Sequence, residues 1–198
     1  MYISDKYKII FIAIPKTGTR TIYNVLETHF QGYLYNDHEL IIPWKYRRYK
    51  SFIIQRNPYD RACSMYWSLC KRIGDKYGYI EKLEENTFVN FLKLLRNKYY
   101  LTDNIRGSHC YPQSLFHTKN RIDNIISFEN LENEFNQLDF VHERILLPQM
   151  NPTVIYNTQQ NLEARPPSSE LLNSESIQLI NEIYKDDFDL LPYDKMTH

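Results

Sequence analysis

The 198-residue sequence has little of what marks several common protein classes. It contains only three cysteines, and no two are spaced as C-x-x-C, which argues against a disulfide framework and against a zinc ribbon. Lysine and arginine number 24, as do aspartate and glutamate, and this formal net charge of zero argues against a protein that coats nucleic acid. The longest apolar runs have the length of a strand, so the sequence predicts no membrane span.

The first eight residues lack the apolar stretch and the small-residue cleavage site of a signal peptide. Together with unpaired cysteines, this absence predicts a cytoplasmic protein. Frequent Tyr, Asn, Ile and Lys indicate an A/T-rich, bacterial or viral genome. The length corresponds to one domain over residues 1–198, and the sequence leaves the oligomeric state open.

Glycine is also scarce, with five in the chain, and one of them lies in the stretch that organises the sequence. Residues 9–14 are apolar and rich in β-branched side chains, which predicts a buried strand that Pro15 ends. Gly18 permits an unusual backbone angle, and helical periodicity follows as far as Leu26. Such a turn leaves N–H groups at a helix N-terminus, and Lys16 adds a positive charge. The stretch therefore predicts a phosphate-binding loop.

The order of residues in this loop differs from that of nucleoside-triphosphate enzymes. In G-x-x-x-x-G-K-[ST] the lysine follows the second glycine, whereas here Lys16 precedes Gly18 and no glycine stands upstream. No strand-end aspartate for magnesium is evident either. An ATP-dependent P-loop kinase is therefore the alternative and not the first interpretation.

A second strand-turn-helix unit follows. Residues 51–55 predict a strand, Asn57 is a plausible N-cap, and Pro58 suits the first helical position. Arg56 ends the strand, and Ser64 lies on the second turn of the helix. A phosphate at this corner would accept charge-assisted hydrogen bonds from the guanidinium and one further bond from the hydroxyl.

The rest of the chain continues the alternation of strands and helices. Helices are expected over 87–97, 129–138 and 174–184, with Ser174 as a cap, and a strand over 124–128. This order is typical of an α/β fold with a mainly parallel sheet, in which ligands bind beyond the carboxyl ends of the strands. Lys16 and Arg56 both fall at such ends.

These two anchors resemble a known family. The residues Pro15-Lys16-Thr17-Gly18-Thr19 are similar to the 5′-phosphosulfate loop of sulfotransferases that use 3′-phosphoadenylyl sulfate (PAPS), and Arg56 with Ser64 resembles their 3′-phosphate site. Residues 111–113, 126–131 and 184–188 are similar to segments of the carbohydrate, heparan 2-O-like branch. The resemblance implies a P-loop-like three-layer domain with a mainly parallel central sheet flanked by helices.

The family also implies an activity, in which a sulfuryl group passes from PAPS to an acceptor hydroxyl by in-line displacement and adenosine 3′,5′-bisphosphate (PAP) leaves. The residues implied to bind PAPS are Pro15, Lys16, Thr17, Gly18, Thr19, Arg20, Thr21, Arg56 and Ser64. Arg20 departs from the family pattern, which has Ser or Thr there, and it either binds the ligand or is a helix-surface charge. No metal is expected, because the leaving phosphate is already acidic.

The reaction needs a base and a group that stabilises charge on the leaving phosphate. Lys16 suits the second task. His38 is the first choice of base, because it lies between the two anchors, where related enzymes place a histidine, and because imidazole accepts protons near neutral pH. Asp37 is expected to hold its tautomer. His109 and Glu39 are the reserves.

The acceptor is the least determined part. Residues 44–50 mix four positive charges with aromatic rings, which suits stacking on a saccharide and equally suits a solvated connector. Tyr99, Tyr100, Arg106 and Tyr111 are further candidates for an acceptor cleft. A saccharide hydroxyl is favoured by the family branch, and a tyrosine or small-molecule hydroxyl is the alternative acceptor. A catalytically silent PAP-binding module is an alternative, and nucleic-acid binding is a weaker one because of the zero net charge.

Overall fold

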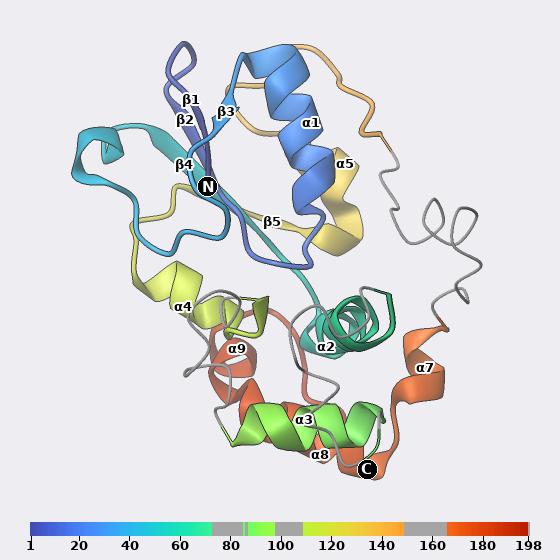
Figure 1. Ribbon diagram of the computed structural model, residues 1–198. Helices are drawn as coiled ribbons and strands as arrows, with labels where there is room; N and C mark the ends of the chain where they lie inside the picture. The colour runs from blue at the N-terminus through green and yellow to red at the C-terminus, as the bar shows by residue number, and fades with distance from the viewer. Residues whose placement is uncertain (73–84, 86, 98–108, 149–165, 198) are drawn as a thin grey trace. The chain divides into compact units, whose positions relative to one another are not determined.

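The computed structural model describes residues 1–72, 85, 87–97, 109–148 and 166–197 (Figure 1). Internal contacts divide the chain into two compact units. The first comprises Met1–Arg56 and Gln113–Met150, and the second comprises Asn57–Pro112 and Asn151–His198. A single functional domain over residues 1–198 stays a prediction.

The first unit is built on a five-stranded mixed sheet with the order β3-β1-β2-β4-β5. Its strands are β1 (Tyr2–Ser4), β2 (Ile9–Ile12), β3 (Tyr33–Leu34), β4 (Lys50–Gln55) and β5 (Asn124–Ser127). The three strands predicted from the sequence, β2, β4 and β5, are parallel neighbours, whereas β1 pairs antiparallel with both β2 and β3. The sequence did not predict β1 or β3, because strands of three and two residues are too short to show a period.

The parallel register brings the two predicted anchors to one edge of the sheet. The ladder between β2 and β4 runs from Ile9↔Lys50 to Ile12↔Ile53. The residues that follow β2 and those that follow β4 therefore emerge at the same, carboxyl edge. The loop around Lys16 and the side chain of Arg56 both belong to that edge.

Two helices, α1 (Thr19–Phe30) and α5 (Leu131–Phe135), pack on one face of this sheet (Figure 1). A single hydrophobic cluster joins side chains of both helices to alternate strand residues, with the rings of Phe11 and Phe52 stacked at 4.9 Å between centroids. On the opposite face, Ile10, Ile12 and Ile53 are also fully buried. Both faces are therefore covered, as a central parallel strand requires.

Short helical segments complete the first unit. They are the 3₁₀ turns η1 (Trp44–Tyr46) and η6 (Phe128–Asn130) and the helix α4 (Gln113–Thr118). The side chain of Asn120, just after α4, accepts the N–H of Ile42 at 2.8 Å and donates to the carbonyl of Leu40 at 2.6 Å. The segment after α4 thus holds the connection that leads from β3 to β4.

The second unit is helical in the part that the structure describes. It contains α2 (Pro58–Tyr66), the π-helical turn η2 (Trp67–Arg72), α3 (Phe88–Arg96), α7 (Ser168–Leu171), α8 (Ser174–Ile183) and α9 (Lys185–Leu190). These helices share one apolar core, in which Arg61 is buried with 1% exposure. Its guanidinium donates to the carbonyls of Tyr111 at 2.8 Å and His109 at 3.3 Å. None of the described helices is long and apolar enough to cross a membrane.

Element boundaries follow the sequence signals closely where a cap fixes them. Asn57 caps α2 by accepting the N–H of Tyr59, and Pro58 is at the first position, as predicted. Helix α8 is capped by Asn173 and not by Ser174, because Asn173 forms a reciprocal capping box with Ser176. Strand β2 ends two residues earlier than predicted, and α5 ends at Phe135 instead of continuing to 138.

Candidate active site

The predicted phosphate loop connects β2 to α1 as a tight turn. Lys16 and Gly18 both have left-handed backbone angles, with φ of 70° and 83°. Gly18 is the N-cap of α1, and it has no side chain that could accept a hydrogen bond from the first turn. The first main-chain N–H groups of the helix therefore point toward this loop without a side-chain cap. These N–H groups and the positive end of the helix dipole favour an anion. The local geometry of this loop is therefore suited to an anion.

The threonines of the loop stabilise its turn. The hydroxyl groups of Thr17 and Thr19 both donate to the carbonyl of Ile14, at 2.8 and 3.0 Å. Thr21 is buried one turn further on, and its hydroxyl donates to the carbonyl of Pro148 at 3.4 Å. Because these hydroxyl protons are engaged within the protein, the main chain and Lys16 are the donors best suited to an anion at this loop.

Gly18 is required here by both its backbone and its surroundings. A Cβ at this position would lie 3.1 Å from Cε2 of Phe128 and 3.3 Å from Cδ2 of Leu131, which is tighter than ordinary van der Waals contact. The φ of 83° is in the left-handed region that other residues adopt only with strain. The glycine thus allows η6 and α5 to approach the loop.

Replacing Gly18 with alanine should destabilise the protein by about 1–3 kcal/mol, because backbone strain and the contact with Phe128 act together. Thermal unfolding measures the effect. Asn24→Ala, at an exposed position of the same helix, is the control and should leave the midpoint nearly unchanged. An unchanged midpoint for Gly18→Ala would mean that the loop relaxes without cost and that the glycine is dispensable.

Arg56 reaches the loop from the end of β4. Its Nη1 donates to the carbonyl of Lys16 at 3.1 Å, and its guanidinium carbon lies 4.3 Å from the ring centroid of Phe128. The same phenyl ring contacts the Gly18 position. The structure therefore brings Arg56 to a loop 40 residues earlier in the chain, where it bonds to Lys16 and shares the Phe128 ring with the Gly18 position.

His38 lies beside the start of the loop. Its side chain is only 11% exposed, and its Nδ1 is 2.9 Å from the carbonyl oxygen of Ala13. An N–H at Nδ1 would donate to that carbonyl, which leaves Nε2 as the basic nitrogen of the neutral ring. The tautomer is thus set by the Ala13 carbonyl and not, as the sequence suggested, by Asp37.

Asp37 instead faces the other ring nitrogen. Its Oδ1 is 3.4 Å from Nε2 of His38 and accepts a hydrogen bond from the hydroxyl of Tyr23 at 3.0 Å. Burial, reinforced by the charge of Asp37, raises the pKa of Tyr23, so this phenol stays a donor. A carboxylate at this distance would stabilise the imidazolium that forms when His38 takes up a proton.

The contacts described above do not include the other residues singled out from the sequence. Arg20 is exposed on the first turn of α1. Ser64 and His109 belong to the second unit, so that the grouping of Ser64 with Arg56 stays a prediction. Among the acceptor candidates, Tyr111 is half-buried in the second unit, and Tyr99, Tyr100 and Arg106 lie outside the described residues.

The aromatic and basic segment 44–50 is partly built into the fold. Tyr46 is buried, and its hydroxyl lies 2.8 Å from that of Tyr33, while the hydroxyl of Tyr49 donates to Asp5 at 2.7 Å. Lys50 begins β4, which places it about 20 Å from Arg56 along a strand that rises about 3.3 Å per residue. The tyrosines thus anchor the connection at the amino edge of the parallel strands, away from the phosphate loop.

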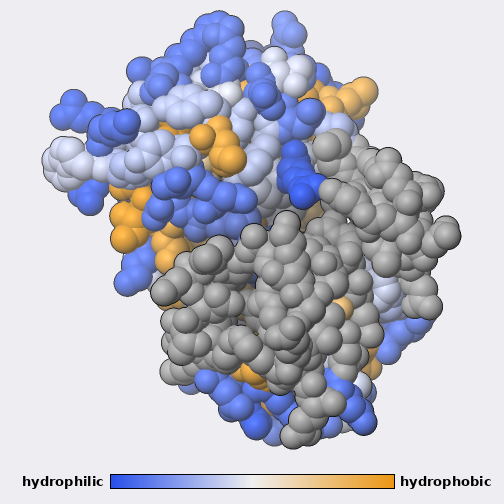
Figure 2. Space-filling model, viewed as in Figure 1, coloured by the Kyte–Doolittle hydropathy of each residue, from blue (hydrophilic) through white to orange (hydrophobic). Residues whose placement is uncertain are grey.

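Trp44 is the exception in this segment, with 79% exposure. The guanidinium of Arg47 lies 4.6 Å from its ring centroid, and this stacked pair faces solvent. In the view of Figure 2 the described surface is mostly hydrophilic, with small separate apolar patches. The exposed indole of Trp44 and the guanidinium stacked on it are therefore confined to this segment and do not belong to a large apolar surface.

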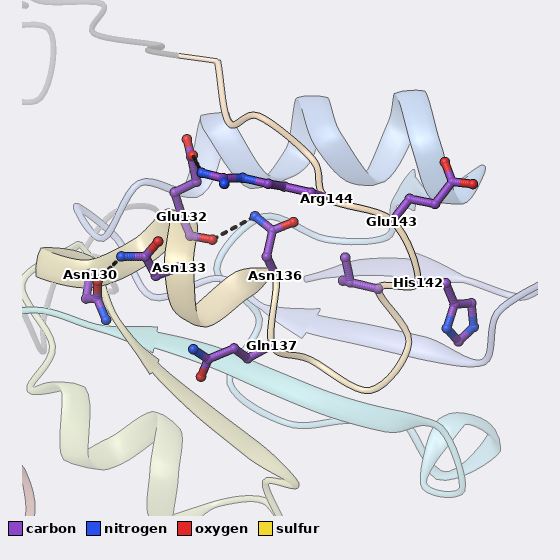
Figure 3. Close-up of a pocket in the computed structure, with 9 residues that line it drawn as sticks. Asn130, Glu132, Asn133, Asn136, Gln137, His142, Glu143 and Arg144 are labelled. Carbon is purple, nitrogen blue, oxygen red and sulfur yellow. Dashed lines mark hydrogen bonds and ion pairs between the residues drawn. The ribbon is translucent and has the colours of Figure 1, made fainter.

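A polar cavity of about 400 Å³ lies beside α5 (Figure 3). Its lining residues are Asn130, Glu132, Asn133, Asn136, Gln137, Val141, His142, Glu143 and Arg144. Arg144 extends toward Glu132 at 3.4 Å, and the side chain of Asn136 accepts the N–H of Ile145 at 2.7 Å. These bonds tie the loop after α5 to the helix, and no residue predicted for the active site lines this cavity.

Metal-ligand chemistry has little support in the described part of the chain. No group of three or more His, Cys, Asp or Glu side chains there is arranged to hold an ion. In the second unit, Cys63, Cys70 and Cys110 are buried and form no disulfide. Burial lowers the pKa of His117 in α4 to about 4, so this histidine is neutral at physiological pH.

Two contacts of the site were not foreseen from the sequence. Gln113 is fully buried, and its amide bonds to both the N–H and the carbonyl of Arg56. Phe128 contacts both Arg56 and the Gly18 position. Both residues lie in segments noted only for their resemblance, and no spacing in the chain relates either of them to Arg56.

The described strands and helices form a mixed α/β fold in which a lysine-bearing loop precedes a helix and an arginine reaches that loop. A model of the sulfotransferase family matches residues 1–194, a range that covers all of the first unit and all but the last four residues of the second. The chain therefore belongs to the sulfotransferase family. Comparison with curated proteins and with solved structures gives no match.

Proposed function

We propose that this protein is a PAPS-dependent O-sulfotransferase. The observation that carries the proposal is the contact between the Arg56 guanidinium and the carbonyl of Lys16, with the Phe128 ring against both Arg56 and the Gly18 position. This contact supports the proposal, because Arg56 would then bind the 3′-phosphate beside a loop suited to a 5′-phosphosulfate group. Ser64, which follows Arg56 by eight residues, is the proposed second 3′-phosphate ligand.

The chemistry assigned to the site is a single in-line displacement. The acceptor hydroxyl oxygen forms a bond to sulfur as the bond from sulfur to the bridging phosphate oxygen breaks, and the electron pair of that bond leaves on PAP. His38 takes the acceptor proton at Nε2. Lys16 and the main-chain N–H groups of the loop stabilise the negative charge that grows on the 5′-phosphate. No metal is required, because the leaving group is an acidic phosphate.

A saccharide is the proposed acceptor. The support is the resemblance of residues 111–113, 126–131 and 184–188 to the carbohydrate branch of the family, and the exposed stacked pair of Trp44 and Arg47. Aromatic faces and cations suit the apolar faces and anionic groups of sugars. The P-loop-like three-layer architecture and the cytoplasmic location remain predictions of the sequence.

Thermal unfolding with PAP, compared with ATP plus magnesium, tests the donor site. At a concentration of about 100 times Kd the native state should gain roughly 2.7 kcal/mol, which corresponds to a shift of about 5–10 °C for a chain of this size. The shift should be selective for PAP and smaller in Arg56→Ala. A shift with ATP and none with PAP would favour the kinase alternative and contradict the proposal.

A further inference from the structure

The backbone of Arg56 is held by an amide side chain from a distant segment. The ladder between β4 and β5 ends at Gln55↔Ser127, so Arg56 is the first residue beyond it. There the Oε1 of Gln113 accepts the N–H of Arg56 at 2.9 Å, and the Nε2 of Gln113 donates to the carbonyl of Arg56 at 2.8 Å. The amide thus extends the ladder by one residue, with a side chain in place of a strand.

This pairing is enclosed and rigid. Gln113 is 0% exposed, at the start of α4, and its amide satisfies both main-chain groups of Arg56 in a bidentate arrangement. Breaking one of these two buried hydrogen bonds would cost stability, because the group that loses its partner would remain buried without a hydrogen bond. The orientation of the Arg56 main chain is therefore fixed before any ligand arrives.

The side chain of Arg56 departs from that fixed main chain along a defined path. Its guanidinium lies over the Phe128 ring at 4.3 Å and donates to the carbonyl of Lys16 at 3.1 Å. An arginine has many rotamers, and a pre-oriented one loses less entropy when it binds a phosphate. A tilt of the Arg56 peptide would move the guanidinium off the ring and away from the loop.

We infer that Gln113 is a positioning residue, which orients Arg56 for the 3′-phosphate of the nucleotide. The inference rests on the proposed function, because it assumes that Arg56 binds that phosphate. It predicts that Gln113 governs the preference for PAP over adenosine 5′-phosphate (AMP), which carries only the 5′-phosphate. A merely structural role would weaken the binding of both nucleotides alike.

The test measures the affinities of PAP and AMP by calorimetry for the wild type and for Gln113→Met. Methionine keeps the volume but neither hydrogen bond, so the affinity for PAP should fall about tenfold while that for AMP changes by less than about twofold. If this variant does not fold, Gln113→Asn replaces it. The shorter amide reaches only one of the two Arg56 groups, and a loss of PAP preference of about threefold is expected.

Asn120→Leu is the matched control. Asn120 makes the same kind of two-point amide bond, to Ile42 and Leu40, just after the helix that Gln113 begins. Its loss should lower the unfolding temperature and leave the ratio of PAP to AMP affinity within about twofold of the wild type. A fall in that ratio for the control as large as that for Gln113→Met would contradict a specific role of Gln113.

The remaining outcomes separate the inference from the proposed function. If the ratio of PAP to AMP affinity is unchanged in Gln113→Met, or if both affinities fall equally, the positioning role is overturned. The proposed donor site still stands in that case, provided that the wild type binds PAP more tightly than AMP. A wild type that binds PAP no better than AMP overturns the proposed 3′-phosphate site, and the role of Gln113 with it.

Discussion

Replacing His38 with asparagine should lower kcat about 10²–10⁴-fold and leave the affinity for PAP unchanged. The reason is that the imidazole ring acts as the base and makes no contact with the nucleotide in the proposed mechanism. Asparagine is the suitable replacement, since His38 has a left-handed φ of 52° that asparagine tolerates better than alanine does. Turnover is measured with a saccharide acceptor, and PAP affinity is measured by calorimetry. Added imidazole should restore part of the rate, which a purely structural defect would not allow.

The matched variant for His38 is His109→Asn. His109 is the reserve base, and it belongs to the second unit, where Arg61 donates to its carbonyl. Retained turnover in His38→Asn together with its loss in His109→Asn would transfer the role of base to His109. Retained turnover in both variants would exclude a histidine base at either position.

Replacing Lys16 with methionine should lower kcat about 10²–10³-fold, the usual cost of removing one donor that stabilises charge in a transition state. Methionine keeps the aliphatic stem, and it meets the same left-handed φ of 70° that lysine already adopts, so the loop should keep its shape. The measurement is single-turnover kinetics with saturating PAPS, which separates the chemical step from nucleotide binding.

Two controls accompany this variant. Lys16→Arg keeps the charge at a different reach and should recover part of the lost rate. Arg20→Thr removes the exposed cation next to the loop and measures its role in nucleotide binding. A rate unchanged in Lys16→Met would mean that the main-chain N–H groups alone stabilise the leaving phosphate, and the proposed role of Lys16 would be withdrawn.

Several elements of both units were predictable, because their signals are local in the chain. The apolar stretch before Pro15 forms β2, and Asn57 and Pro58 begin α2 as their cap chemistry requires. The parallel pairing of β2 and β4 follows from the strand-helix-strand order. The antiparallel strand β1 did not follow, because three residues show no period and only pairing defines them as a strand.

The contacts inside the candidate site were decided by the tertiary structure. Residue types and spacing indicated Lys16, Gly18 and Arg56 as phosphate-binding residues, since a loop at a helix N-terminus and a strand-end arginine are visible in the chain. The bond of His38 to the Ala13 carbonyl and the bonds of Gln113 to Arg56 join residues 25 and 57 positions apart. Such distant contacts have no sequence period, so only tertiary packing creates them.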